Sequence, residues 1–302
     1  MITTRAVVLA RGLGTRMREP DPAARLSAAQ RRAADAGSKM MVPVHGRPFL
    51  DYVLGALADA GISDVALVVA PDHAAVAGHY AANSPARVSL SFVVQPEAMG
   101  TANAVLAAEA WTAGAPFLAL NADNLYPVTA LRDLASLAEP GLPAFARDDL
   151  VRTSNIAADR IHAFALVDVD DEGYLTAIVE KPGTLPPEGG SHESEPGSHE
   201  IEQRSGAISQ VNSVASTFRR KNRRTTFVSM NCWRFDARIF EACRGVARSA
   251  RGEFELPEAV ALAMRRGVRF RAIPAVGPVL DLSRRADTAD VERRLAGVDP
   301  RP

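Results

Sequence analysis

Residues 5–17 read Arg-Ala-Val-Val-Leu-Ala-Arg-Gly-Leu-Gly-Thr-Arg-Met, a β-branched run that leads directly into a glycine-rich loop. The apolar run over 5–9 predicts a short strand, and Gly12 and Gly14 predict a tight turn after it. Glycines let backbone N–H groups come close to a phosphate. Thr15 and Arg16 follow at once, and they add a hydroxyl and a guanidinium that can grip phosphate oxygens through two parallel hydrogen bonds.

Two familiar phosphate loops do not fit this stretch. The dinucleotide-binding pattern needs a third small residue at position 17, where the chain has Met17. The Walker pattern needs Gly-Lys-Ser/Thr, which is absent. An NAD-dependent dehydrogenase is therefore disfavoured.

The segments after this loop alternate in character. Strand-like runs separated by helical spacing imply right-handed βαβ units and a parallel sheet. We expect strands at 65–69, 89–94 and 116–121, and helices at 48–60 and 101–110. Further along, runs at 163–169 and 175–180 flank turn residues 170–173 and predict a hairpin.

From 183 to about 224 the composition changes to Gly, Pro, Ser, His, Glu and Gln, with a basic run at 219–224. We interpret 183–225 as a flexible insertion. The basic run could bind a polyanion, although a solvated loop is the simpler interpretation. Order is expected to resume at 227–235, with helices at 255–266 and 286–295.

Composition limits the function. The 302 residues carry 35 basic and 35 acidic side chains, and 47% are hydrophobic, which is typical of a globular protein. Zero net charge argues against a nucleic-acid-binding protein, because such binding rests on excess positive charge. Cys232 and Cys243 cannot form a disulfide framework. No apolar run approaches the roughly 20 residues of a membrane span and no signal peptide is apparent, so we expect a cytoplasmic enzyme.

Lysine is rare, and arginine supplies almost all of the basic charge. The lysines are Lys39, Lys181 and Lys221, and codon bias explains the low total. Lys39 precedes Met-Met-Val-Pro-Val, and its compact charge suits a phosphate that changes geometry during a reaction; the alternative is an ordinary surface lysine. Lys181 follows Glu180 at the end of a predicted strand.

The segment 95–105 lies between a predicted strand and a predicted helix. Gly100 permits close backbone approach, and Thr101 is expected to cap the helix. Gln95 offers one acceptor and two donors, which is enough to recognise the edge of a nucleobase. A capped helix after a tight turn is an equally good interpretation of this segment alone.

Acidic side chains end two apolar runs. Asp123 follows a buried strand, at the edge where open α/β sheets bind ligands, and it is a candidate Mg²⁺ ligand; the alternative is a helix cap. Asp281 ends a late strand and is a second candidate. Asn231, in Met-Asn-Cys-Trp-Arg-Phe, is a candidate substrate-binding residue.

Taken in order, these motifs resemble those of the sugar-phosphate nucleotidyltransferases, which include glucose-1-phosphate thymidylyl- and uridylyltransferases. The resemblance covers 5–182 and 226–295. It implies a Rossmann-like, mixed and mostly parallel sheet flanked by helices, with a small β-rich sugar-binding part. It also implies a single domain over 1–302, with a nucleotide-binding part at 1–130 and a sugar-phosphate-binding part at 131–295.

The resemblance assigns roles to individual residues. It implies that the loop holds the nucleoside triphosphate, and that Gln95, Gly100 and Thr101 recognise the base. It also implies that Arg16 and Lys39 are catalytic and neutralise the departing pyrophosphate. It implies that Glu180 and Lys181 hold the sugar phosphate, and that Asp123 and Asp281 bind Mg²⁺. The triphosphate loop residues in this assignment are Gly12, Gly14, Thr15 and Arg16.

This chain departs from the family pattern in four places. Arg11 stands where the family has glycine, and Ala122 precedes the metal aspartate in place of another glycine. A polar segment of about 19–37 separates Lys39 from the loop, and the segment after Lys181 is long. The residues around Asp281 read Leu-Asp-Leu-Ser, without the family's Trp-x-Asp-x-Gly.

The implied reaction joins an NTP to a sugar 1-phosphate and releases pyrophosphate. The phosphate oxygen is already anionic at neutral pH, so positioning and charge neutralisation should supply the catalysis. Alternatives are transfer to a non-sugar phosphate, or a non-catalytic subunit that binds a nucleotide sugar. Enzymes of this family often form dimers or tetramers, so a homo-oligomer is one expectation.

Overall fold

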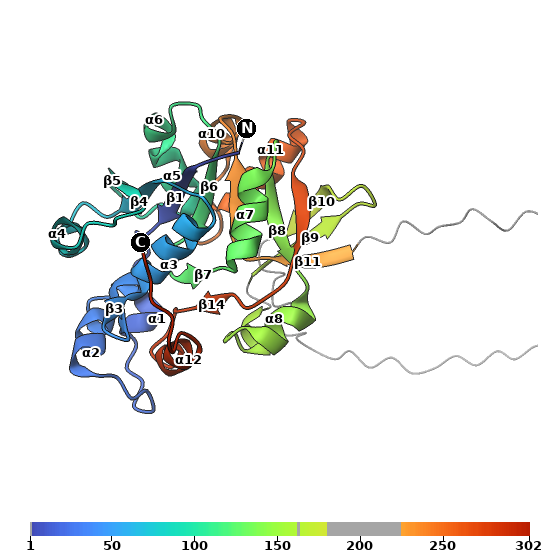
Figure 1. Ribbon diagram of the computed structural model, residues 1–302. Coiled ribbons are helices and arrows are strands. Elements are labelled where there is room, and N and C mark those ends of the chain that lie inside the picture. Colours follow the sequence, from blue (N-terminus) through green and yellow to red (C-terminus); the bar gives the residue numbers. More distant parts are fainter. Residues whose placement is uncertain (1, 162–163, 180–224) are drawn as a thin grey trace, which may run out of the picture. The chain divides into compact units, whose positions relative to one another are not determined.

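The computed structural model describes residues 2–161, 164–179 and 225–302. The predicted insertion at 183–225 lies almost wholly outside them. The described residues form one compact unit, in which a central sheet is covered by helices on both faces (Figure 1). Among the described residues, no helix is both long and apolar enough to cross a membrane.

Fourteen described strands are present. They are β1 Arg5–Leu9, β2 Pro43–Val44, β3 Arg47–Pro48, β4 Asp64–Val69, β5 Ser89–Val94, β6 Phe117–Asn121, β7 Asn124–Leu125, β8 Gly141–Phe145, β9 Ala165–Val169, β10 Leu175–Val179, β11 Thr225–Ser229, β12 Trp233–Phe235, β13 Arg271–Ala275 and β14 Leu280–Asp281.

The described helices include one short 3-10 helix, η1. They are α1 Thr15–Arg18, α2 Ala28–Asp35, η1 Lys39–Met41, α3 Phe49–Asp59, α4 Ala74–Ala82, α5 Thr101–Ala107, α6 Glu109–Thr112, α7 Val128–Ser136, α8 Arg147–Thr153, α9 Ala158–Ile161, α10 Arg238–Gly245, α11 Leu256–Arg265 and α12 Asp287–Arg294.

Ten of the described strands form one mixed sheet. Its order is β10-β9-β11-β8-β12-β6-β1-β4-β5, with β13 parallel to β8. The strands β6, β1, β4 and β5 run parallel, as the alternation of strands and helices predicts. The strands from β12 to β10 pair antiparallel and include the predicted hairpin of β9 and β10. The mixed sheet flanked by helices is therefore confirmed.

The strand β1 shows how the sheet divides the core. Ala6 and Val8 belong to the apolar cluster under α3 and α7, while Val7 belongs to the cluster under α5, α10 and α11. All three side chains are fully buried, because successive residues of a central strand point to opposite faces. Both faces of the sheet are therefore covered by apolar side chains, so polar functional residues are expected in the loops at the strand ends.

The connections around β1 create a crevice at its carboxyl end. The chain passes from β1 to β4 on one side, and it returns after β5 to place β6 on the other side. Open α/β sheets bind ligands where the strand order reverses in this way. The loops that follow β1 and β6 begin at Ala10 and Ala122 and lie next to each other there, since Ala122 N donates to Leu9 O at 3.1 Å.

One predicted helix is divided in two. The spacing over 101–110 predicts a continuous helix, but α5 ends at Ala107 and α6 begins at Glu109. Ala108 between them has ψ near 0°, and its N–H bonds to Val105 and Leu106 carbonyls, which tightens the last turn of α5. Ala102, Ala104 and Ala108 all belong to the apolar cluster on this face of the sheet, so the Ala-rich face is still buried.

Candidate active site

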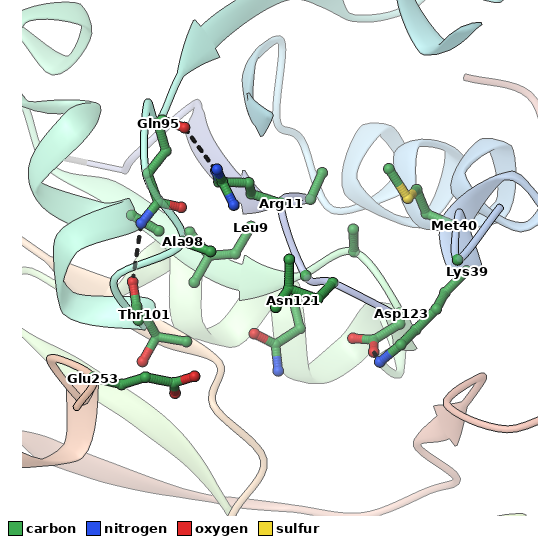
Figure 2. A pocket seen from close by; sticks show the side chains of 17 residues that line it. Leu9, Arg11, Lys39, Met40, Gln95, Ala98, Thr101, Asn121, Asp123 and Glu253 are labelled. Carbon is green, nitrogen blue, oxygen red and sulfur yellow. Dashed lines mark hydrogen bonds and ion pairs between the residues drawn. The ribbon is translucent and has the colours of Figure 1, made fainter. Parts of the chain in front are cut away.

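A cavity of about 240 Å³ opens at the carboxyl ends of β1 and β6 (Figure 2). It receives side chains from four separate stretches of the chain, namely 9–13, 37–40, 95–104 and 121–123, together with Glu253. Six of the predicted site residues line it. They are Gly12, Lys39, Gln95, Gly100, Thr101 and Asp123.

The glycine loop is shaped by a close backbone contact. Gly14 has φ +63°, and a Cβ at this position would lie 2.1 Å from the carbonyl oxygen of Gly37. Only glycine fits, so the loop packs directly against the end of the 19–37 segment. Nothing lies within 4 Å of a Cβ at Gly12, which leaves its backbone open toward the cavity.

The other loop residues are placed differently from the prediction. Thr15 and Arg16 are exposed in α1 and do not line the cavity, although they were predicted to contact a triphosphate. Arg285 holds α1, the short helix that follows the glycine loop. Its Nε donates to Met17 O at 2.9 Å, and its Nη2 donates to Arg18 O at 3.2 Å. The segment before the last helix therefore supports the first loop of the chain.

Lys39 and Asp123 form an ion pair at one end of the cavity (Figure 2). Nζ of Lys39 lies 2.9 Å from Oδ2 of Asp123, and each side chain is 20% exposed. Lys39 opens η1, and Asp123 follows β6, so the pair joins the inserted segment to the central sheet. The structure thus favours a site role for Lys39 over an ordinary surface position.

A magnesium ion would find one protein carboxylate here. Oδ1 of Asp123 makes no hydrogen bond with any described residue. Among the described residues, no three His, Cys, Asp or Glu side chains gather as a metal site. Mg²⁺ usually takes one or two carboxylates and completes its octahedron with water and substrate phosphates. The donors present therefore fit a metal shared with a bound phosphate.

Asp281 does not face this cavity. Its carboxylate pairs with Arg160 and accepts hydrogen bonds from Asn124 Nδ2 and Ser283 Oγ, both at 2.9 Å. Arg160 also pairs with Asp287 at 2.6 Å. Its guanidinium therefore occupies the place beside the Asp281 carboxylate that a metal ion would need. The geometry therefore does not support Asp281 as a metal ligand in this arrangement.

Burial dominates the electrostatics of Asp281. The side chain is 3% exposed, and burial together with the nearby Asp123 charge raises the pKa of Asp281 to about 6 despite the Arg160 pair. Through β14, Asp281 pairs with Asn124, and Leu282 N donates to Asp123 O at 2.9 Å. Asp281 thus helps to hold the backbone that presents Asp123.

Gln95 is buried at the opposite end of the cavity. Its Nε2 donates to Gly100 O at 3.2 Å and to Asn103 Oδ1 at 2.7 Å. Its own main-chain oxygen accepts from Arg11 Nε at 2.6 Å, and Arg11 Nη2 donates to Pro96 O at 3.0 Å. Both ends of Gln95 are therefore fixed before any ligand binds.

Gly100 and Thr101 join this end of the cavity to a distant segment. Gly100 has φ +101°, and a Cβ there would lie 2.5 Å from the Phe254 oxygen. Thr101 was predicted to cap α5, but Gly100 occupies the cap position, and the Thr101 hydroxyl accepts from Leu256 N at 2.9 Å. This hydroxyl holds the 253–256 segment, and Glu253 from that segment lines the cavity near Thr101 (Figure 2).

The remaining predicted residues fall outside the cavity or outside the described chain. Asn231 has φ +57° and donates through Nδ2 to Oδ1 of Asn121, a cavity residue, at 2.9 Å. Glu180 and Lys181 lie outside the described residues. Glu253 and Asn121 also line the cavity, and Asn103 contacts Gln95, although no motif in the sequence predicts these three residues. Two acids close together in Glu253-Phe-Glu255 are the one sequence feature that could have indicated a site there, and no recognisable motif accompanies them.

Comparisons with known proteins show the family to which this chain belongs. A family model described as nucleotidyl transferase matches residues 5–277. The chain is 25% identical over 298 residues to a glucose-1-phosphate thymidylyltransferase from Streptomyces antibioticus, covering 98% of this chain and 68% of that protein. It is 26% identical over 290 residues to the UTP–glucose-1-phosphate uridylyltransferase AglF from Haloferax volcanii, covering 96% of each.

Other relatives are longer. A 108-residue stretch is 43% identical to the bifunctional protein GlmU of Sinorhizobium fredii, and it covers 36% of this chain and 20% of that protein. Among solved structures, a UDP-glucose pyrophosphorylase complexed with UDP-glucose matches with a TM-score of 0.67 at 17% identity, over 98% of this chain and 99% of the other. That likeness shows the fold.

Proposed function

The chain belongs to the nucleotidyl transferase family, and we propose that it transfers a nucleotidyl group from an NTP to a sugar 1-phosphate, releasing pyrophosphate. The two relatives that match nearly the whole chain are named for this reaction with glucose 1-phosphate, which supports a hexose 1-phosphate as acceptor. The observation that carries the proposal is the Lys39–Asp123 pair in the same cavity as Gln95.

The two ends of the cavity suit two parts of one nucleotide. The fixed amide of Gln95 suits a nucleobase, which is recognised by hydrogen bonds on its edge. Gly12 and Lys39 suit the phosphates, because an open backbone and a compact cation both favour anions. We infer that the base lies against Gln95 and that the phosphates extend toward Lys39 and Asp123.

Charge and position would supply the catalysis. An incoming sugar phosphate is already anionic, so the obstacle is repulsion between two polyanions. Lys39 would neutralise charge on the triphosphate as the pyrophosphate departs. The carboxylate of Glu253 repels phosphates and accepts hydrogen bonds from hydroxyls, so we place a hydroxyl-bearing group, and not a phosphate, beside it.

We propose that Asp123 holds the Mg²⁺ through its free Oδ1. A metal ion held there would supply positive charge that neutralises charge developing on the phosphates. Lys39 would have to release Asp123 and turn to the phosphates as substrate enters, so the ion pair keeps both groups in place beforehand. The predicted sugar-phosphate residues Glu180 and Lys181 remain part of this proposal.

Pyrophosphate release separates this function from its alternatives. Purified protein is assayed with each NTP and with glucose 1-phosphate, other sugar 1-phosphates and phospho-alcohols, with and without Mg²⁺. We expect release only with a sugar 1-phosphate and the metal. Release with a phospho-alcohol alone would indicate another acceptor, and nucleotide-sugar binding without any release would indicate a non-catalytic subunit.

A further inference from the structure

The orientation of the Gln95 side-chain amide follows from its partners. The carbonyl oxygen of Gly100 can only accept a hydrogen bond, so the Gln95 group that contacts it must be the NH₂. The same NH₂ lies 2.7 Å from Asn103, whose contacting atom must then be its oxygen. The donor and acceptor roles of these groups alone fix which amide atom is nitrogen and which is oxygen.

This orientation leaves one polar atom of the side chain unused. Both N–H hydrogens of the Gln95 amide are engaged, while no described residue donates to Oε1. Figure 2 shows this oxygen on the cavity side of the amide. Gln95 is 3% exposed, so water cannot replace its partners. Turning the amide over would break both hydrogen bonds and place Oε1 against the oxygens of Gly100 and Asn103.

Arg11 fixes the other end of the same residue. Its guanidinium donates to the main-chain oxygens of Gln95 and Pro96 at 2.6 and 3.0 Å, which ties the loop after β1 to the loop after β5. Among the described residues, Arg11 forms no ion pair with a carboxylate. Its bonds to neutral carbonyls therefore serve to hold the backbone in place, at a position where the family usually has glycine.

We propose that Arg11 and Asn103 are positioning residues that preset Gln95 as a hydrogen-bond acceptor, so that the cavity selects a pyrimidine with a ring N–H over one without. Uracil and thymine carry a hydrogen on N3. Cytosine carries a lone pair on its N3, which would face the lone pairs of Oε1. This inference rests on the proposed function, and it names the base edge that the cavity recognises.

Nucleotide binding tests the inference without turnover. UTP and CTP share the same ribose and triphosphate and differ only at the base edge, so calorimetric Kd values for the two give a selectivity ratio. We expect the unaltered protein to favour UTP by roughly 10- to 100-fold, since a mismatched pair leaves buried polar groups unsatisfied. A 3-methyluridine triphosphate should bind as weakly as CTP.

Two matched variants at one position separate positioning from general damage. Asn103→Asp keeps an oxygen that accepts from the Gln95 NH₂, and Asn103→Leu keeps the branched shape of the side chain without any acceptor. We expect Asn103→Asp to retain the selectivity ratio, and Asn103→Leu to lower it to within about 3-fold of unity, as the amide becomes free to turn. Thermal unfolding checks that both variants are folded.

The ratio of the UTP and CTP Kd values also tests the positioning role of Arg11. Arg11→Ala releases the backbone of Gln95, so we expect UTP affinity to fall more than CTP affinity. Equal UTP and CTP binding in the unaltered protein, or an unchanged ratio in Asn103→Leu, would overturn the inference. Selective binding without pyrophosphate release would overturn only the proposed function, whereas release from both UTP and CTP with equal Kd would overturn only this inference.

Discussion

Nζ of Lys39 lies 2.9 Å from Oδ2 of Asp123, although 84 residues separate them in the chain. The pair forms because the strand β6 ends beside β1, while the segment before η1 folds back over the glycine loop. A cation and an anion held together in a partly exposed cavity neutralise each other until a charged substrate competes for both. Several predictions depend on this pair.

Replacing Asp123 by Asn should abolish most activity while the fold survives. The amide keeps the size of the side chain but loses the charge that would hold Mg²⁺. We expect kcat to fall by at least about 100-fold in a pyrophosphate-release assay. Asp72→Asn, at an exposed turn, is the matched control and should retain normal turnover. Near-normal turnover in Asp123→Asn would remove this carboxylate from the mechanism.

Replacing Lys39 by Met should have opposite effects on catalysis and on metal binding. The reaction loses a cation near the phosphates, so kcat should fall by about 10²- to 10³-fold. In the variant without nucleotide, however, Asp123 no longer forms an ion pair with a lysine. Free Mn²⁺, a spectroscopic substitute for Mg²⁺, should therefore bind more tightly to Lys39→Met than to the unaltered protein. Electron paramagnetic resonance of free Mn²⁺ measures this, and weaker binding would contradict the competition.

Asp281 and Asp123 should differ sharply in their effect on the metal. The oxygens of Asp281 are engaged by Arg160, Asn124 and Ser283, whereas Oδ1 of Asp123 is free. In the presence of a non-hydrolysable nucleotide analogue, Asp123→Asn should lose most Mn²⁺ affinity. Asp281→Asn should change the Mn²⁺ affinity by less than about 3-fold. Equal losses in both variants would restore Asp281 as a ligand.

The raised pKa of Asp281 predicts a pH dependence of stability. Its pKa is about 6 in the folded protein and about 3.9 when unfolded. The folded state binds this proton more tightly, so the stabilising contribution is complete below pH 4 and is lost as the pH rises toward 6. Between pH 4 and pH 7 the unaltered protein should lose up to about 3 kcal/mol of unfolding free energy relative to Asp281→Asn. Chemical denaturation of both proteins at several pH values measures this difference in unfolding free energy. A difference that stays constant between pH 4 and pH 7 would contradict the raised pKa.

Two neighbouring glycines should respond differently to alanine. A Cβ at Gly14 would meet the Gly37 backbone at 2.1 Å and would need an unfavourable φ, so Gly14→Ala should lose about 2–3 kcal/mol of stability. A Cβ at Gly12 meets nothing within 4 Å, so Gly12→Ala should keep its stability and weaken only nucleotide binding. Equal melting temperatures for the two variants would contradict the role of the Gly14–Gly37 contact.

The sequence predicts the central strands well because their signals are local. The runs that became β1, β4 and β6 are apolar and bounded by turn residues, and parallel strands place their carboxyl ends at one edge. Lys39 follows no strand, so only the resemblance to the family predicted its place in the site, whereas the strand rule was enough for Gln95 and Asp123. It applies to any residue that directly follows such a strand.

The rest of the site depends on contacts that local patterns do not encode. Thr101 bonds to the backbone of Leu256, and Arg160 reaches Asp281 from a short helix. Neither pair has a spacing in the sequence that could predict it. The same is true of Asn103, whose importance appears only once its distance to Gln95 is known. Such partners are set by how separate elements pack.

The support that Arg285 gives to the Met17 and Arg18 carbonyls also has a meaning for protein synthesis. A chain leaves the ribosome from its N-terminus, and its early strands can begin to pair before the final residues emerge. The residues of the glycine loop stay without this brace until the chain up to Arg285 has been translated. Nascent chains that stop before Arg285 should therefore be poor at retaining a nucleotide.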